Sequence, residues 1–201
     1  MKEEIGLLSG FLVILSAVPY AIRTYQGKIQ PNLTSWGIWA ILGLALLLTY
    51  KSSGATSNVW PAVFGFTNPC LITLLALWKG GRKRPNTLEV TCLIVGLASI
   101  ILWYFARETK ALSQYVLYVA ITADAVAAIP TIVFVWKEPC GDRPFAWVMF
   151  GVGYGLAIFA IEECSFSNYV LPVYMFVGAT SIATILIIYR IKQKTPISQW
   201  I

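Results

Sequence analysis

Asp124 is the residue whose type and position point most directly to chemistry. It lies twelve residues from either end of an apolar run, 112–136, and it is the only acidic residue deep inside such a run. If the run crosses a bilayer, a charge at its centre costs at least about 2.5 kcal/mol, so the side chain should face a cavity or a partner. Burial favours the protonated carboxyl, which would permit proton exchange near neutral pH. The sequence predicts a carboxyl that binds a ligand or carries a proton, or else a structural acid bonded to a neighbouring helix.

Asn68 is a second polar side chain near the middle of an apolar run, 59–78. Its amide has donors and an acceptor that suit the hydroxyl or carboxyl groups of a solute. We expect it to face Asp124 at the same depth, with an interhelical hydrogen bond as the alternative. The other candidate pocket residues are the aromatic side chains Trp36, Trp39, Trp147 and Tyr154 and, more weakly, Thr67, Tyr20, Thr131 and Thr180. Packing or interfacial anchoring is an equal alternative for the aromatic residues.

The composition sets the class of protein. Of the 201 residues, 58% are hydrophobic and only 12% charged, and the mean hydropathy is +0.71. An average soluble domain has roughly twice that charged fraction, so an ordinary soluble enzyme is excluded, as are a disordered chain and a disulfide scaffold. The chain has no histidine and its four cysteines form no C-x-x-C pair. We therefore expect free cysteines, no metal, no cofactor and no catalytic nucleophile–base pair, so the chain is not expected to be an enzyme.

Seven runs are long and apolar enough to cross a membrane, which takes roughly 20 residues each. The first is read as a retained span because the acidic start Met1-Lys2-Glu3-Glu4 does not resemble a signal peptide. The predicted spans are 5–22, 34–50, 59–78, 88–106, 112–136, 145–161 and 169–189.

Basic residues predict the direction of the spans. With the N-terminus outside, eleven of the 15 lysines and arginines fall on the inner side and four on the outer side. Because cytoplasmic loops carry the excess of lysine and arginine, the count favours N-out and C-in. The net charge of +6 is explained in the same way, without a nucleic-acid partner. The basic run 80–84 is expected to contact anionic lipid.

The sequence contains an internal repeat at an offset of 111 residues. At this offset Pro19 aligns with Pro130, and Trp36 with Trp147. Spans four crossings apart point the same way, so the expected fold is an all-α membrane protein with two parallel three-helix bundles, spans 1–3 and 5–7, joined by span 4. Pro19 and Pro130 would kink the first helix of each bundle and form a matched hinge or gate. The resulting parts are a first bundle at 1–79, a linker with the fourth helix at 80–110, a second bundle at 111–195 and a cytoplasmic tail at 196–201.

This arrangement resembles the SWEET and PQ-loop transporter superfamily. The resemblance rests on the three-one-three order, the late proline in each first helix, and the entries Pro31-Asn32-Leu33-Thr34-Ser35-Trp36 and Pro144-Phe145-Ala146-Trp147. The family's Pro-Gln pair is replaced here by Pro19-Tyr20 and Pro130-Thr131. Bacterial nicotinamide riboside transporters share the same architecture.

The resemblance implies a carrier for a sugar, an amino acid or a nucleoside-like solute, working by alternating access at a pocket between the bundles. In the cystinosin-like branch an acid in the helix of Asp124 takes part in proton coupling. The sugar transporters use an asparagine in the third helix of each bundle, where this chain has Asn68 and Ala179. The implied location is a prokaryotic inner membrane.

Other classes of function stay open on the sequence. A ligand receptor or cargo-binding scaffold could use the same fold, and a single acid per chain would form a cation channel only in an oligomer. The expected partners are a small solute and membrane lipids, and the sequence does not decide whether the chain forms a homo-oligomer.

Overall fold

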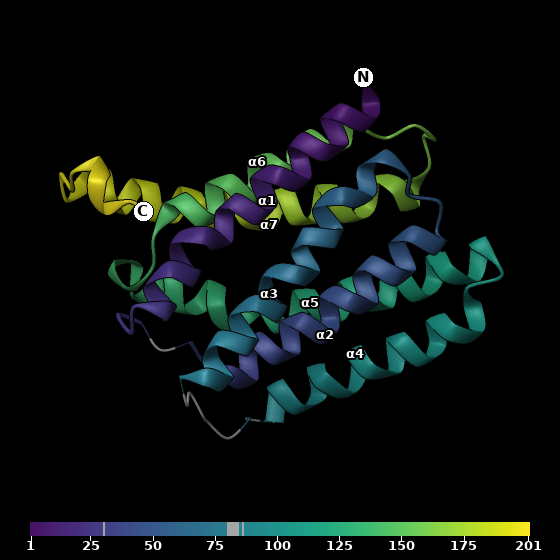
Figure 1. The fold of residues 1–201 in the computed structure, drawn as a ribbon, viewed down its shortest axis with the longest axis horizontal. Helices are drawn as coiled ribbons and strands as arrows, with labels where there is room; N and C mark the ends of the chain where they lie inside the picture. The colour runs from purple at the N-terminus through teal and green to yellow at the C-terminus, as the bar shows by residue number, and fades with distance from the viewer. Residues whose placement is uncertain (30, 80–84, 86) are drawn as a thin grey trace.

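The computed structural model describes residues 1–29, 31–79, 85 and 87–201, and all regular structure in them is helical (Figure 1). The predicted basic run 80–84 lies outside the described residues. The long helices are α1 (Lys2–Tyr25), α2 (Leu33–Ser52), α3 (Trp60–Trp78), α4 (Thr87–Ala106), α5 (Lys110–Lys137), α6 (Pro144–Phe159) and α7 (Phe166–Lys192). Short 3₁₀ helices are η1 (Ser57–Val59), η2 (Pro139–Gly141) and η3 (Ile197–Gln199).

The predicted spans are confirmed as helices, and their apolar character fits a multi-pass membrane protein. Six of them, α1 to α5 and α7, are long and apolar enough to cross a membrane. The seventh, α6, has only 16 residues and ends at Phe159, two residues before the predicted boundary. At 1.5 Å per residue it spans about 24 Å, less than the roughly 30 Å hydrocarbon core.

Large apolar side chains cover the outside of the molecule, as lipid contact requires. Phe105 is 76% exposed and Trp136 is 72% exposed. In water such a surface would be an aggregation hazard, whereas in a bilayer it is the surface that lipid tails solvate.

The helix ends define two faces of the molecule. The Met1 face consists of residue 1 and the loops 53–56, 107–109 and 160–165. The Arg143 face consists of the loop residues 26–29 and 138–143 and the tail 193–201. The tail folds back on the start of α6, where the Phe145 amide donates to the Trp200 carbonyl at 3.2 Å.

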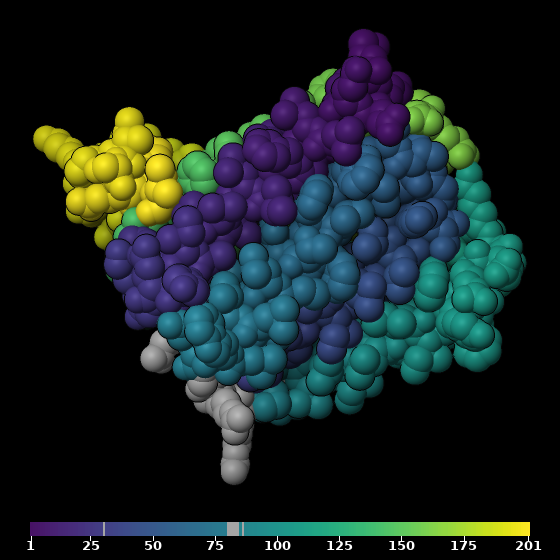
Figure 2. Space-filling model, in the orientation of Figure 1, coloured from purple at the N-terminus to yellow at the C-terminus, as the bar shows by residue number. Residues whose placement is uncertain are grey.

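Helices far apart in sequence lie side by side. α1 packs against α3 and α6, and α2 packs against α3, α4 and α5. The other main neighbours are α4 with α5, α5 with α7, and α6 with α7. Across the face seen in Figure 2, α1, α3, α2 and α4 follow one another, so that α3 lies between α1 and α2.

Small residues bring α1 and α6 close together. A Cβ atom at Gly153 of α6 would lie 2.7 Å from Cγ2 of Val13 and 2.8 Å from the carbonyl oxygen of Ser9. Glycine and serine at such crossings let two membrane helices approach until their backbones are in van der Waals contact. The α1–α6 crossing therefore depends on the missing side chain at position 153.

The buried core is divided unevenly between the two faces. On the side of the Met1 face, one cluster joins six helices: Val13, Ala45, Leu46, Tyr50, Ala55, Ala62, Leu117, Ala120, Ile121, Tyr154 and Leu171. Toward the Arg143 face there are two separate clusters, one of α2, α4 and α5 around Leu42, and one around Leu186 of α7. Apolar packing therefore joins residues 1–79 to residues 111–201 mainly in the Met1-side half.

Replacing Gly153 by alanine should destabilise the protein, because the added methyl group would push α1 away from α6. Overpacking of this kind costs about 1–3 kcal/mol in unfolding free energy. Gly178→Ala is the matched control, since a Cβ there meets nothing within 4 Å. Denaturant titration in mixed micelles should show a loss for Gly153→Ala and no loss for Gly178→Ala. Equal stability of the two variants would show that the α1–α6 crossing is not tightly packed.

Candidate functional site

Asp124 is hydrogen-bonded to a tyrosine of the last helix. Its Oδ2 accepts from the Tyr174 hydroxyl at 2.8 Å, and this bond links α5 to α7. The carboxyl group is half-buried, beside the buried residues Ala120 and Ala123. The sequence did not single out Tyr174. The structure therefore provides the partner that the position of Asp124 demands, on a helix 50 residues further along the chain.

Tyr154 completes a polar cluster with these two residues. It is 3% exposed, and its hydroxyl donates to the carbonyl oxygen of Pro61 at 3.2 Å, across the boundary between α6 and α3. It fits there because residue 65 is glycine. A Cβ atom at that position would lie only 2.6 Å from the Tyr154 hydroxyl oxygen. Tyr154 and Tyr174 both interact electrostatically with Asp124, so we call these three residues the Asp124 cluster.

Asn68 has a different partner from the one that the sequence led us to expect. It is buried, and its Nδ2 donates to the carbonyl oxygen of Val13 in α1 at 2.8 Å. Val13 is the position that the repeat aligns with Asp124. In both halves, therefore, the third helix donates a hydrogen bond to the first helix at this position. Asp124 and Asn68 are each bonded within their own half, and their binding roles stay predictions.

The other predicted aromatic residues bond locally near the Arg143 face. The Trp36 indole donates to the Tyr20 hydroxyl at 3.3 Å, and Trp39 stacks edge-on against Trp36. The Trp147 indole donates to Oδ2 of Asp142 at 2.9 Å. Each bond ties the entry of α2 or α6 to an adjoining element.

Two of the predicted threonines also donate hydrogen bonds within their own helices. Thr67 and Thr180 donate to carbonyl oxygens of their own helices, those of Phe64 and Phe176. Bonds of this kind satisfy a hydroxyl inside a membrane helix without a ligand. These residues are thus not drawn into the Asp124 cluster by a hydrogen bond.

The two prolines proposed as hinges lie inside helices. Pro19 is within α1 and Pro130 within α5, and neither interrupts its helix. Pro130 also lines the cavity described next, together with Thr131.

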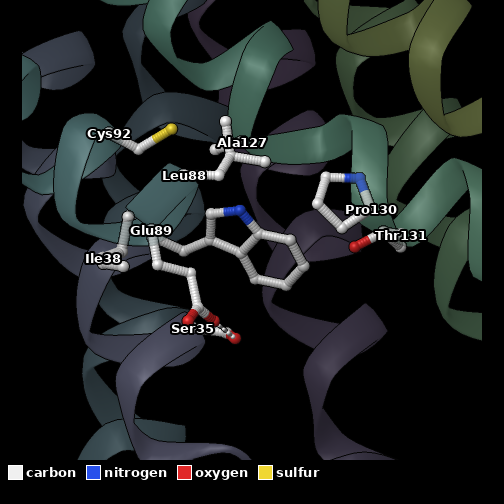
Figure 3. Close-up of a pocket in the computed structure, with 9 residues that line it drawn as sticks. Ser35, Ile38, Leu88, Glu89, Cys92, Ala127, Pro130 and Thr131 are labelled. Atoms are coloured by element: carbon white, nitrogen blue, oxygen red, sulfur yellow. Dashed lines mark hydrogen bonds between the residues drawn. The ribbon is translucent and has the colours of Figure 1, made fainter. Parts of the chain in front are cut away.

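A small cavity of about 80 Å³ lies between α2, α4 and α5, toward the Arg143 face (Figure 3). Its polar side chains come from three helices: Ser35 from α2, Glu89 from α4 and Thr131 from α5. Ser35 donates to Oε1 of Glu89 at 2.8 Å and accepts from the Asn32 amide at 2.8 Å. The sequence interpretation passed over Glu89 because it stands at the edge of a span, where acids are ordinary at a helix start.

Polar contacts close the Met1 face. The Tyr50 hydroxyl donates to the carbonyl oxygen of Asn168 at 2.7 Å, and Lys110 forms an ion pair with Glu163 at 2.6 Å. Lys2 donates to the carbonyl oxygen of Ile161, and Ser57 donates to Glu162. Among the described residues, the hydrogen bonds that join 1–79 to 111–201 lie in this half of the molecule.

The Arg143 face has the opposite electrostatics. Burial lowers the pKa of the Arg143 guanidinium group, and the positive charges of Arg23 at the end of α1 and Arg190 near the end of α7 lower it further. Like charges from the two halves therefore repel across this face, whereas at the Met1 face the two halves are joined by hydrogen bonds.

Comparison of the chain with protein-family models, curated proteins and solved structures found no match. Among the described residues, no three cysteine, aspartate or glutamate side chains gather as metal ligands would. The resemblance to the SWEET and PQ-loop transporters therefore remains a prediction from the sequence.

The bond between Asp124 and Tyr174 should contribute measurably to stability. Interhelical hydrogen bonds in membrane proteins contribute about 0.6 kcal/mol on average and about 1.7 at most. We expect Tyr174→Phe and Asp124→Leu to show a coupling energy of about 1 kcal/mol in a double-mutant cycle of unfolding free energies. The control is the same cycle with Tyr115→Phe in place of Tyr174→Phe. Tyr115 is an exposed tyrosine of α5, so its effect and that of Asp124→Leu should be additive. Additive effects for Asp124 and Tyr174 themselves would contradict the bond.

Proposed function

We propose that the chain is a membrane carrier that moves a small polar solute by alternating access between two three-helix bundles, α1–α3 and α5–α7. The observation that carries the proposal is the pattern of helix packing. The pair α1–α3 corresponds to α5–α7, α2–α3 corresponds to α6–α7, and α1–α6 corresponds to α5–α2. Exchanging each helix with the one four places later reproduces every one of these contacts. This is the pattern expected of two parallel repeats related by a two-fold axis along the membrane normal.

The internal repeat supports the same division of the chain. The aligned pairs Pro19 with Pro130 and Trp36 with Trp147 fall on corresponding helices, α1 with α5 and α2 with α6. The remaining helix, α4, packs against α2 and α5 and has no counterpart. Two similar bundles with one joining helix can rock against each other as rigid bodies, which is how many carriers expose a site to each side in turn.

The unequal faces support a carrier in one of its end states. Hydrogen bonds join the two bundles at the Met1 face, whereas like charges of Arg23 and Arg143 face each other across the other side. We take the Met1 face as the outer side, as the basic residues predict. The arrangement then corresponds to a carrier closed to the outside. Transport requires the Met1-side contacts to break and the Arg143 side to close.

Asp124 is the group best suited to couple solute movement to protons. It is the acid deepest in the helices; Tyr174 donates a hydrogen bond to it, and Tyr154 interacts with it electrostatically. A carboxyl in such a place alternates most readily between a charged form and a neutral one when water reaches it from one side at a time. The solute class remains that of the sequence prediction: a sugar, an amino acid or a nucleoside-like molecule.

The proposed function is tested with purified protein in liposomes. A thermal-shift screen of sugars, amino acids and nucleosides should find a solute that stabilises the protein, by about 2.7 kcal/mol at a hundred times its Kd. That solute should enter liposomes saturably, and a pH gradient should drive its accumulation. Asp124→Asn should keep the hydrogen bond and the binding but lose the response to the gradient. Saturable binding without uptake would instead identify a receptor, and ionic currents would identify a channel.

Native cysteines report which way the protein lies in the cell membrane. Cys164 is exposed on the Met1 face and Cys140 is exposed on the Arg143 face. In cells, an impermeant thiol reagent added outside should label Cys164 and spare Cys140. The reverse labelling would contradict the N-out orientation.

A further inference from the structure

The cavity between α2, α4 and α5 is a second polar site, on the Arg143 side of the Asp124 cluster. Figure 3 shows Glu89 and Ser35 together at one side of it, with Thr131 and Pro130 across from them and Cys92 and Ala127 further along. Its volume of about 80 Å³ is enough for two or three water molecules, since one water takes about 30 Å³ in the liquid. Water needs polar partners to occupy such a space, and Ser35, Glu89 and Thr131 supply them.

The cavity lies along the helix face that carries Asp124. Ala127 and Thr131 both line it, and they follow Asp124 on α5 by three and seven residues, so all three lie on one face of the helix. The chain direction of α5 places the cavity one to two turns nearer to the Arg143 face than Asp124 is. The thiol of Cys92, which also lines the cavity, interacts electrostatically with both Asp124 and Glu89. Glu89 therefore lies at the cavity, and Asp124 lies one to two turns beyond it along the same face of α5.

We propose that Glu89 delivers protons from the Arg143 side to Asp124 through water held in this cavity. A proton from solution binds a Glu89 carboxylate oxygen, and Glu89 then gives a proton to the bridging water. The water passes a proton to Oδ1 of Asp124, because Oδ2 already accepts from Tyr174. The net result is one proton moved from solution to Asp124, with Glu89 returned to its carboxylate. This inference rests on the proposed function, since it supplies the coupling proton of that carrier.

The groups around Glu89 are consistent with this role. α4 packs against α2 and α5. Among the described residues, the titratable group nearby on α4 is Cys92, and on α5 it is Asp124, with Lys137 at the end of that helix. The titratable groups of α2, Tyr50 and Lys51, lie at its other end, near the Met1 face. From α2, the neutral hydroxyl of Ser35 donates a hydrogen bond to Glu89.

The repeat explains why the path serves only one bundle. The position that corresponds to Asp124 in the first bundle is Val13, whose side chain has no titratable group. The helix that supplies Glu89 is α4, the one helix without a counterpart, and it contacts α5 rather than α1. The acid therefore occurs in the bundle whose first helix, α5, packs against α4.

The experiment is a pH jump on purified protein, followed by the infrared band of the protonated Asp124 carboxyl, which Asp124→Asn identifies by its loss. Glu89→Gln can keep the hydrogen bond from Ser35 but carries no acidic proton. We expect it to slow protonation of Asp124 at least tenfold, and Glu89→Asp to restore most of the rate. Ala127→Phe, which fills the cavity and leaves both carboxyls in place, should also slow it. Glu108→Gln, at an exposed acid of the Met1 face, should change nothing.

The outcomes separate this inference from the proposed function. If Glu89→Gln and Ala127→Phe protonate Asp124 at the wild-type rate, the path is wrong, whether or not the protein transports. An Asp124 band that does not respond to pH would overturn it as well. If the rates fall as expected but liposomes take up no solute, the path stands and the carrier proposal fails. Thermal midpoints of the variants show that a changed rate does not come from unfolding.

Discussion

Polar groups inside a membrane must find their partners within the protein, and the rest of this structure depends on that constraint. It accounts for an all-helical chain, since a helix satisfies its own backbone. It also accounts for the hydroxyls of Thr49, Ser9 and Ser16, which donate to carbonyl oxygens of the helices that carry them. Asp124 and Asn68 have side chains that bond across to another helix, and they link the first and third helices of their respective halves.

The same constraint sets how the two halves meet. On the Met1 side, glycine and serine bring α1 and α6 into contact, and hydrogen bonds join the two halves there. On the Arg143 side, separate apolar clusters and repelling arginines leave less to hold the halves together. The Met1 side is therefore the more tightly joined of the two. The carrier proposal uses this asymmetry, and the cavity at Glu89 lies toward the other side.

The sequence predicted the helices well because hydropathy is a local property. Each apolar run became a helix, and the depth of Asp124 followed from counting residues. The partners of the polar residues were not predictable in this way. The rotation of α7 against α5, which brings Tyr174 to Asp124, depends on tertiary packing, which the hydropathy of a single segment does not contain. Glu89 was passed over for a related reason, since only the tertiary structure places Ser35 beside it. We expected Asp124 to face Asn68 because both lie at the same depth in their helices. Equal depth does not fix the direction in which each side chain points, and each is bonded to a different partner.

Distance measurements by electron spin resonance across both faces test the central claim most directly. In a background without the other cysteines, one label pair joins Thr56→Cys to Cys164 on the Met1 face, and another joins Lys28→Cys to Cys140 on the Arg143 face; all four positions are exposed. The account predicts that acidification or a transported solute creates a population in which the Met1-face distance lengthens and the Arg143-face distance shortens. Two single distances that stay unchanged under all these conditions would contradict alternating access.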